Sequence, residues 1–351
     1  MNDTATLLRV EDLTYDLPRE RIADRPAEPR EAARLLVVRW DPLRLEHRYV
    51  RDLPALLQPG DVLVVNRTRV IKARLDVHKT TGGRVTLVVV AHNRDTLRAL
   101  LQRGKLKPGQ TVAVGPHRLT CVYREGSWVD LSLPRDLSLS ELLERYGRMP
   151  LPPYIPRTPD RVDEVWYQPA VAREPGSIAA PTASLHFTPA LLEKLERRGV
   201  RRVELVLHVG PGTFLPIRGE RFEEHRMLPE PYRIPPETRA ALHDARKQGA
   251  RIVAAGTTVV RALESWAWGE GPAEGETDLF IYPGYRFRVI QGFWTNFHQP
   301  RSTPLAMVAA FAGWERVRQA YREALDRGYR FLSYGDATFW MPEGSNADHT
   351  A

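Results

Sequence analysis

One segment places hydroxyl and basic side chains where a strand runs into a helix. In residues 254–265, AAGTTVVRALES, Thr257 and Thr258 open the expected helix, and Arg261 follows one turn later. The free N–H groups and the dipole of a helix N-terminus attract anions. Glu264 follows Arg261 at i+3, a spacing that allows an ion pair. The segment indicates either an anion site or an ordinary strand–helix turn with a threonine cap.

A second strand runs into a glycine-rich turn. In LHVGPGTFLP the strand ends at His208, and Gly210 and Gly212 follow. Glycines let a ligand approach the backbone closely, and ligands of open α/β sheets bind at the carboxyl ends of strands. A ligand-binding loop and a structural turn are equally weighted interpretations.

Four further polar residues lie on loops. His186 in SIAAPTASLHFT precedes a helix cap, and Asn296 and His298 share the polar loop WTNFHQPRST. Asp336 follows the strand-like FLSY, where it either binds a ligand or completes a turn. Hydrogen-bonding side chains on loops after strands are typical of α/β enzymes.

Several common sites are missing from the sequence. It has no Walker loop and no GxGxxG after a strand, which disfavours a Rossmann dehydrogenase or methyltransferase. The histidines show no HxH, HxxH or HExxH spacing, and a single cysteine, Cys121, excludes a CxxC site. We therefore expect neither a metal site nor a bound redox cofactor.

The elements that must position these residues change type along the chain. Residues 61–133 show short strands, with a hairpin signal at TTGG, which indicates a small antiparallel barrel or sandwich. Ser138 and Glu141 form a capping box for a helix that stops at Gly147. The proline-rich stretch 150–159 indicates a domain boundary or a rigid inter-domain loop.

Helices and strands alternate after this boundary. The last helix, residues 303–328, has a weak point at Gly313. Alternation predicts an α/β domain with some parallel pairing. Because the first 70 residues show the same pattern, we expect a discontinuous α/β catalytic domain, residues 1–70 and 151–351, with a β domain inserted at 71–150.

Size and charge agree with this division. The chain has 351 residues, which favours two domains. Lys and Arg total 51 against 43 Asp and Glu, so the net charge of +8 indicates either a basic surface or a nucleic-acid partner. The single cysteine, the charged N-terminus without an apolar core and the lack of an 18-residue apolar run predict a cytoplasmic protein with no membrane segment.

Ten collinear strings between about residues 10 and 340 resemble one family. They include LQPGDVLVVNRTRVIKARL, APTASLHFTPALLEKLERRGV, LHVGPGTFLPIR, AAGTTVVRALES, TNFHQPRST and YRFLSYGDA. The chain is identified by them as similar to the S-adenosylmethionine:tRNA ribosyltransferase-isomerases of queuosine biosynthesis. The resemblance implies an α/β domain with an inserted β-barrel.

The resemblance also implies an unusual reaction. S-adenosylmethionine is a co-substrate that donates its ribosyl group to the aminomethyl group of a 7-deazaguanine at the tRNA wobble position. The product is epoxyqueuosine-tRNA, and adenine and methionine leave. The implied partners are S-adenosylmethionine and the tRNA anticodon stem-loop; we favour a monomer.

The implied chemistry suggests a role for each of the residues above. It needs a base near neutral pKa, for which His186 or His208 is suited. His298 and Asn296 are expected to contact adenine or ribose. The strand–helix segment with Thr257, Thr258 and Arg261 is expected to bind the methionine carboxylate or a tRNA phosphate, and Asp336 an amine.

The chain departs from the family pattern at Arg67, Ser184, Leu228 and Gln299. These departures motivate a second hypothesis, a diverged enzyme that uses S-adenosylmethionine with another acceptor. A third hypothesis is a non-catalytic RNA-binding relative, which would bind tRNA with a steep salt dependence without consuming S-adenosylmethionine.

Overall fold

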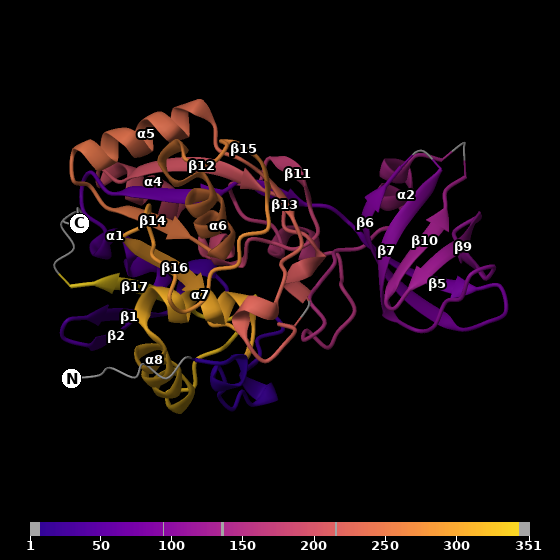
Figure 1. Ribbon diagram of the computed structural model, residues 1–351, viewed down its shortest axis with the longest axis horizontal. Helices are drawn as coiled ribbons and strands as arrows, with labels where there is room; N and C mark the ends of the chain where they lie inside the picture. Colours follow the sequence, from indigo (N-terminus) through magenta and orange to yellow (C-terminus); the bar gives the residue numbers. More distant parts are fainter. Residues whose placement is uncertain (1–7, 94, 135–136, 215, 344–351) are drawn as a thin grey trace.

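A computed structural model of the protein describes residues 8–93, 95–134, 137–214 and 216–343. The expectation that the chain lacks a leader peptide rests partly on residues 1–7, which lie outside the described residues. A large α/β body and a smaller β-barrel stand side by side in Figure 1. The fold class expected from the sequence is confirmed.

A mixed sheet forms the centre of the body. The interior strand β3 (Val62–Asn66) is buried throughout, with Val62 and Val64 in the core on one face and Leu63 and Val65 in the core on the other. Such a continuous apolar run is what a strand covered on both faces requires. The strand order is β15 (Glu274–Thr277), β13 (Glu230–Arg233), β12 (Arg201–Leu207), β3, β14 (Ile252–Ala255), β16 (Gly292–Asn296), β17 (Ala337–Pro342), β1 (Arg34–Trp40) and β2 (Arg44–Tyr49).

Four neighbouring strands of this sheet run in the same direction. β12 and β14 both pair in parallel with β3, and β16 pairs in parallel with β14. Their carboxyl ends therefore meet at one edge of the sheet. This is the edge where the segments singled out in the sequence begin.

Helices cover both faces of the sheet. The apolar sides of α1 (Leu53–Leu56) and α4 (Pro189–Arg197) pack on one face. The other face is covered by α5 (Pro236–Lys247), α6 (Thr257–Trp266), α7 (Thr303–Ala312) and α8 (Trp314–Asp326). The last two helices correct the expectation of one long helix: the chain breaks at Gly313, where φ is +84°.

The inserted strands close into a barrel, which settles the choice between barrel and sandwich. The barrel order is β10 (Trp128–Ser132), β7 (Thr96–Arg103), β6 (Arg84–His92), β5 (Arg74–Lys79), β8 (Thr111–Val114) and β9 (His117–Glu125). Leu142 and Leu143 of α2 (Leu139–Tyr146) join its core. As predicted, Ser138 Oγ caps α2 by accepting a hydrogen bond from the Glu141 N–H at 3.2 Å.

Gly147 ends α2 for a reason other than the expected left-handed turn. Its φ is −71°, which any residue can adopt. A Cβ at this position would lie 2.1 Å from the Lys72 carbonyl oxygen and 2.3 Å from that of Leu143. Glycine is needed because two chain segments cross closely where the barrel joins the body.

Short elements complete the connections. β4 (Thr68–Val70) leads into the barrel and pairs in parallel with β11 (Glu174–Ser177), and α3 (Asp163–Trp166) follows the proline-rich stretch. The remaining turns of 3-10 helix are η1 (Val10–Asp12), η2 (Arg19–Arg21), η3 (Arg30–Ala32), η4 (Val50–Asp52), η5 (Thr182–His186), η6 (Pro211–Phe214), η7 (Phe222–Glu224) and η8 (Ala267–Gly269).

Candidate active site

The N-terminus of α6 lies at the edge where the parallel strands end. Gly256 joins β14 to α6 with a φ of +104°, and a Cβ there would come within 3.2 Å of the Cβ of Ala183. Thr257 and Thr258 follow as the first helical residues, and Asn66 Nδ2 at the end of β3 donates to Thr258 Oγ1 at 3.2 Å. The expected strand–helix site is thus held by a neighbouring strand.

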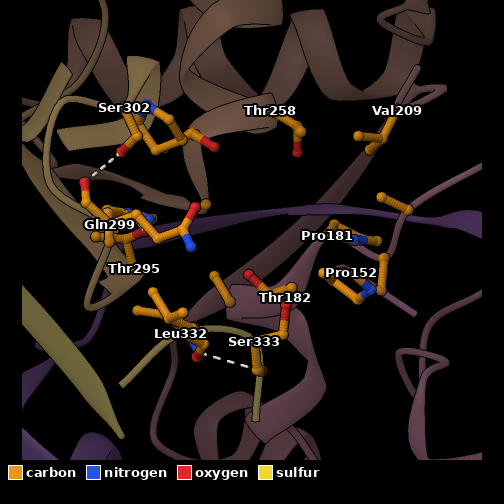
Figure 2. Close-up of a pocket in the computed structure, with 18 of the residues that line it drawn as sticks. Pro152, Pro181, Thr182, Val209, Thr258, Thr295, Gln299, Ser302, Leu332 and Ser333 are labelled. Atoms are coloured by element: carbon orange, nitrogen blue, oxygen red, sulfur yellow. Dashed lines mark hydrogen bonds between the residues drawn. The ribbon is translucent and has the colours of Figure 1, made fainter. Parts of the chain in front are cut away.

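A cavity opens at this edge (Figure 2). It holds about 760 Å³ of space, including its open mouth. Its walls come from segments far apart in the sequence: Pro152, Tyr154, Tyr167, residues 179–183, Val209, residues 256–258, residues 295–299, Ser302, Pro304, Leu332 and Ser333. Four residues predicted from the sequence line it together, namely Thr257, Thr258, Asn296 and His298.

His298 is the histidine that lines the cavity. Its Nε2 lies 2.9 Å from Thr295 Oγ1, and its backbone N–H donates to the Tyr321 hydroxyl at 3.0 Å. Burial lowers the pKa of the imidazole to about 3. The ring is therefore neutral at physiological pH, the form that can accept a proton.

Asn296 lines the cavity, but its side-chain amide is hydrogen-bonded to other protein groups. Nδ2 donates to the carbonyl oxygens of Leu332 at 2.9 Å and Ser333 at 3.3 Å. Oδ1 accepts from Nε2 of His186 at 3.2 Å. Asn296 therefore joins three segments of the wall.

His186 lies behind this wall. It is 5% exposed, packs edge-on against Trp294, and borders a small side space with Arg30 and Tyr334. Burial lowers its pKa to about 4, with smaller contributions from surrounding groups.

A second cavity of about 430 Å³ adjoins the first across Thr257, Thr258, Val209 and Pro304. It is more apolar, and Leu279, Phe280, Ile281, Met227 and Met307 contribute to its walls. The N-terminus of α6 stands between the two cavities.

Arg261 lines this second cavity, but its partner is not Glu264. Its guanidinium pairs with the buried Glu230 and donates to the carbonyl oxygens of Thr277 at 2.8 Å and Leu279 at 3.0 Å. Glu264 instead accepts from the N–H groups of Arg288 and Val289. The expected i+3 ion pair is wrong because each side chain finds a partner from a distant segment.

The glycine turn supports the second cavity from outside. The Gly210 N–H donates to Glu230 Oε1 at 2.7 Å, and Gly212 packs near Leu228. Neither glycine is among the residues that line the two cavities, whereas the preceding Val209 lines both.

His208 and Asp336 are not brought to the cavity. His208 Nδ1 lies 2.8 Å from Thr68 Oγ1, and its ring packs on Gly176. Asp336 precedes β17 rather than following a strand, and its buried carboxylate accepts from the N–H groups of Arg34 at 2.9 Å and Arg330 at 2.7 Å. Asp336 fixes the turn that carries Ser333.

Sequence reasoning missed the aromatic part of the wall. Tyr154 lies in the proline-rich stretch and its hydroxyl is 2.7 Å from Ser333 Oγ, while Tyr167 follows α3. The available signal was the string PPYIP, where an aromatic residue interrupts prolines. The prolines of this stretch predict only a boundary or an inter-domain loop.

Of the four departures from the family pattern, Gln299 lines the cavity. Arg67 does not line the cavity. Its guanidinium nitrogens lie 3.5 Å from a carboxylate oxygen of Glu174 and 3.9 Å from one of Glu204. Ser184 is fully buried.

Two features are absent from the described part of the chain: a metal-binding cluster and a membrane-spanning helix. Within residues 8–343, less the three short gaps, no three His, Cys, Asp or Glu side chains gather in a way that could hold a metal ion. Among the helices of this same part of the chain, none has both the length and the apolar character needed to cross a bilayer.

Comparison with known proteins gives one consistent picture. Residues 10–340 match a family model described as a queuosine biosynthesis protein. The chain is 49% identical over 341 residues to the S-adenosylmethionine:tRNA ribosyltransferase-isomerase of Rubrobacter xylanophilus, covering 96% of this chain and 99% of the relative. It is 45% identical over 334 residues to the protein of the same name from Aquifex aeolicus, covering 94% and 98%.

A solved structure agrees. The crystal structure of S-adenosylmethionine tRNA ribosyltransferase from Thermotoga maritima is 36% identical in sequence, with a TM-score of 0.54 and coverage of 94% of this chain and 99% of that chain.

Proposed function

The chain belongs to the queuosine biosynthesis family of S-adenosylmethionine:tRNA ribosyltransferase-isomerases, and we propose that its paired cavities bind S-adenosylmethionine for transfer of the ribosyl group to tRNA. The acceptor is the aminomethyl group of 7-aminomethyl-7-deazaguanine at the wobble position of the anticodon stem-loop. Adenine and methionine leave, and epoxyqueuosine-tRNA is formed.

The observation that carries this proposal is the position of the α6 N-terminus between the two cavities. The N–H groups of a helix N-terminus favour a negative group, and Thr257 and Thr258 add hydroxyls there. The methionine carboxylate is the negative group of S-adenosylmethionine. We place it at this helix end, with the apolar part of the methionine chain in the second cavity.

Arg261 supports this site without contacting the methionine carboxylate itself. Because its guanidinium is held by Glu230 and two carbonyl oxygens, it fixes the wall of the second cavity and adds a partly compensated positive charge. This replaces the direct carboxylate contact expected from the sequence.

We assign His298 as the base from its position in the cavity wall, although its pKa of about 3 lies below the neutral value that suits a base. Of the three histidines considered, it lines the main cavity, whereas His186 lies behind the wall and His208 contacts Thr68. The proton next to the sulfonium is acidified by the positive sulfur, so a neutral imidazole can accept it. Asn296 holds the wall through Leu332, Ser333 and His186.

Two of the four departures from the family pattern, Arg67 and Gln299, do not favour another acceptor. The charge of Arg67 is matched by Glu174 and Glu204, away from both cavities. Gln299 is an uncharged side chain at the cavity wall.

The test is a reaction with tRNA that carries 7-aminomethyl-7-deazaguanine. We expect adenine release from S-adenosylmethionine and a matching mass gain of the modified nucleoside. Unmodified tRNA of the same sequence is the control. Adenine release at the same rate with modified and unmodified tRNA would favour the diverged enzyme. Binding of tRNA without any adenine release would favour the RNA-binding relative.

A further inference from the structure

The tyrosines of the cavity wall differ in how their hydroxyls are bonded. The Tyr154 hydroxyl lies 2.7 Å from Ser333 Oγ. The Tyr167 hydroxyl is buried and has no hydrogen-bond partner among the described residues. Both tyrosines line the main cavity.

A buried hydroxyl without a partner is costly and rare in native proteins, so it calls for a physical reason. The polar neighbours of the Tyr167 hydroxyl are the Ala180 backbone and the Ser333 side chain, and both residues also line the cavity. The hydroxyl therefore lies directly behind the wall surface formed by these two residues. Burial raises its pKa, so it stays protonated and can donate.

The ring of Tyr167 is held firmly in place. It packs edge-on against Tyr334, with ring centroids 5.9 Å apart and planes at 75°. The Tyr334 hydroxyl donates to Asp163 Oδ1 at 2.9 Å, and Arg157 donates to both Asp163 oxygens at 2.6 Å. Since Asp163 is fully buried, this chain of contacts gives Tyr167 a rigid support.

We propose that Tyr167 is a substrate-binding residue whose hydroxyl donates a hydrogen bond to S-adenosylmethionine in the main cavity. The assignment rests on the function proposed above. S-adenosylmethionine is the ligand because this cavity meets the α6 N-terminus, where its carboxylate is placed. When it displaces solvent from the cavity, a wall hydroxyl must bond to it or stay unpaired.

Tyr167→Phe tests this, with Tyr154→Phe as the matched control. Tyr167→Phe removes no hydrogen bond of normal geometry among the described residues, only weaker contacts to Ala180 and Ser333, so its Tm without ligand should stay within about 1 °C of wild type. Tyr154→Phe takes away the partner of Ser333 and should lower Tm by about 1–3 °C. At saturating modified tRNA, Tyr167→Phe should lower kcat/KM for S-adenosylmethionine about 5- to 100-fold, with KM for tRNA unchanged.

Two results would overturn the proposal. One is a lower Tm of Tyr167→Phe with unchanged kinetics, which indicates a structural hydroxyl. The other is a loss confined to KM for tRNA. If wild type releases no adenine at all, the proposed function fails; equilibrium dialysis of S-adenosylmethionine against wild type and Tyr167→Phe then judges the binding role separately, and equal affinities would refute it.

Discussion

Nε2 of His186 lies 3.2 Å from Oδ1 of Asn296. The Asn296 amide nitrogen faces two carbonyl oxygens, so Oδ1 is the acceptor and His186 must donate from Nε2. This contact fixes the tautomer of a neutral imidazole. The contact ties η5 to the end of β16.

The first prediction separates the histidines. His298→Ala should lower kcat for adenine release by about 10²- to 10⁴-fold, because it removes the proton acceptor at the cavity wall. His208→Ala removes a contact to Thr68 outside both cavities and should keep kcat within about threefold. Equal losses in the two variants would contradict the assignment.

The second prediction concerns acid stability. The folded-state pKa values of His186 and His298, about 4 and about 3, lie below the unfolded value of about 6.5. Between these limits the unfolded chain binds protons that the folded protein does not, so stability falls as the pH falls below about 6.5. Each histidine contributes a slope of up to about 1.4 kcal/mol per pH unit.

Urea unfolding between pH 4.5 and 7.5 measures this slope. His186→Gln should reduce it by about one proton. His78→Gln, a substitution at an exposed position of β5, is the control variant. A wild-type slope of zero across this window would contradict the prediction.

The third prediction compares two carboxylates near Arg157. Asp163 is buried and accepts from both guanidinium nitrogens at 2.6 Å, whereas the exposed Asp160 lies 3.9 Å away. Asp163→Asn leaves a charge uncompensated and should cost about 3 kcal/mol of unfolding free energy. Asp160→Asn should cost much less, since solvent screens that pair. The two are compared by denaturant unfolding, and equal losses would argue against a rigid support for Tyr334.

The fourth prediction uses two glycines with positive φ. In Gly256→Ala and Gly60→Ala the new alanine must adopt the positive φ of the glycine, +104° and +93° respectively. This costs about 1–2 kcal/mol of unfolding free energy. Only at Gly256 does the new Cβ also meet a neighbour, Ala183 at 3.2 Å. Gly256→Ala should therefore displace the start of α6 and raise KM for S-adenosylmethionine several-fold, while Gly60→Ala leaves KM unchanged. Steady-state kinetics at saturating tRNA decides between them.

The sequence predicts those features that depend on neighbouring residues. The capping box of Ser138 and Glu141 and the strand–helix turn at Thr257 are visible in a few letters, and parallel strand ends bring Thr258, Asn296 and His298 to one edge. The partners of side chains are not local. Arg261 pairs with Glu230 across 31 positions, and Tyr154 meets Ser333 across 179, so no short spacing rule could find either.

The contact between Tyr154 and Ser333 has a consequence for protein synthesis. One partner belongs to the first half of the chain and the other is translated near its end, and both line the same cavity. A nascent chain that stops before residue 333 lacks this part of the cavity wall. Residues separated by 179 positions must therefore both be synthesised before this wall can form.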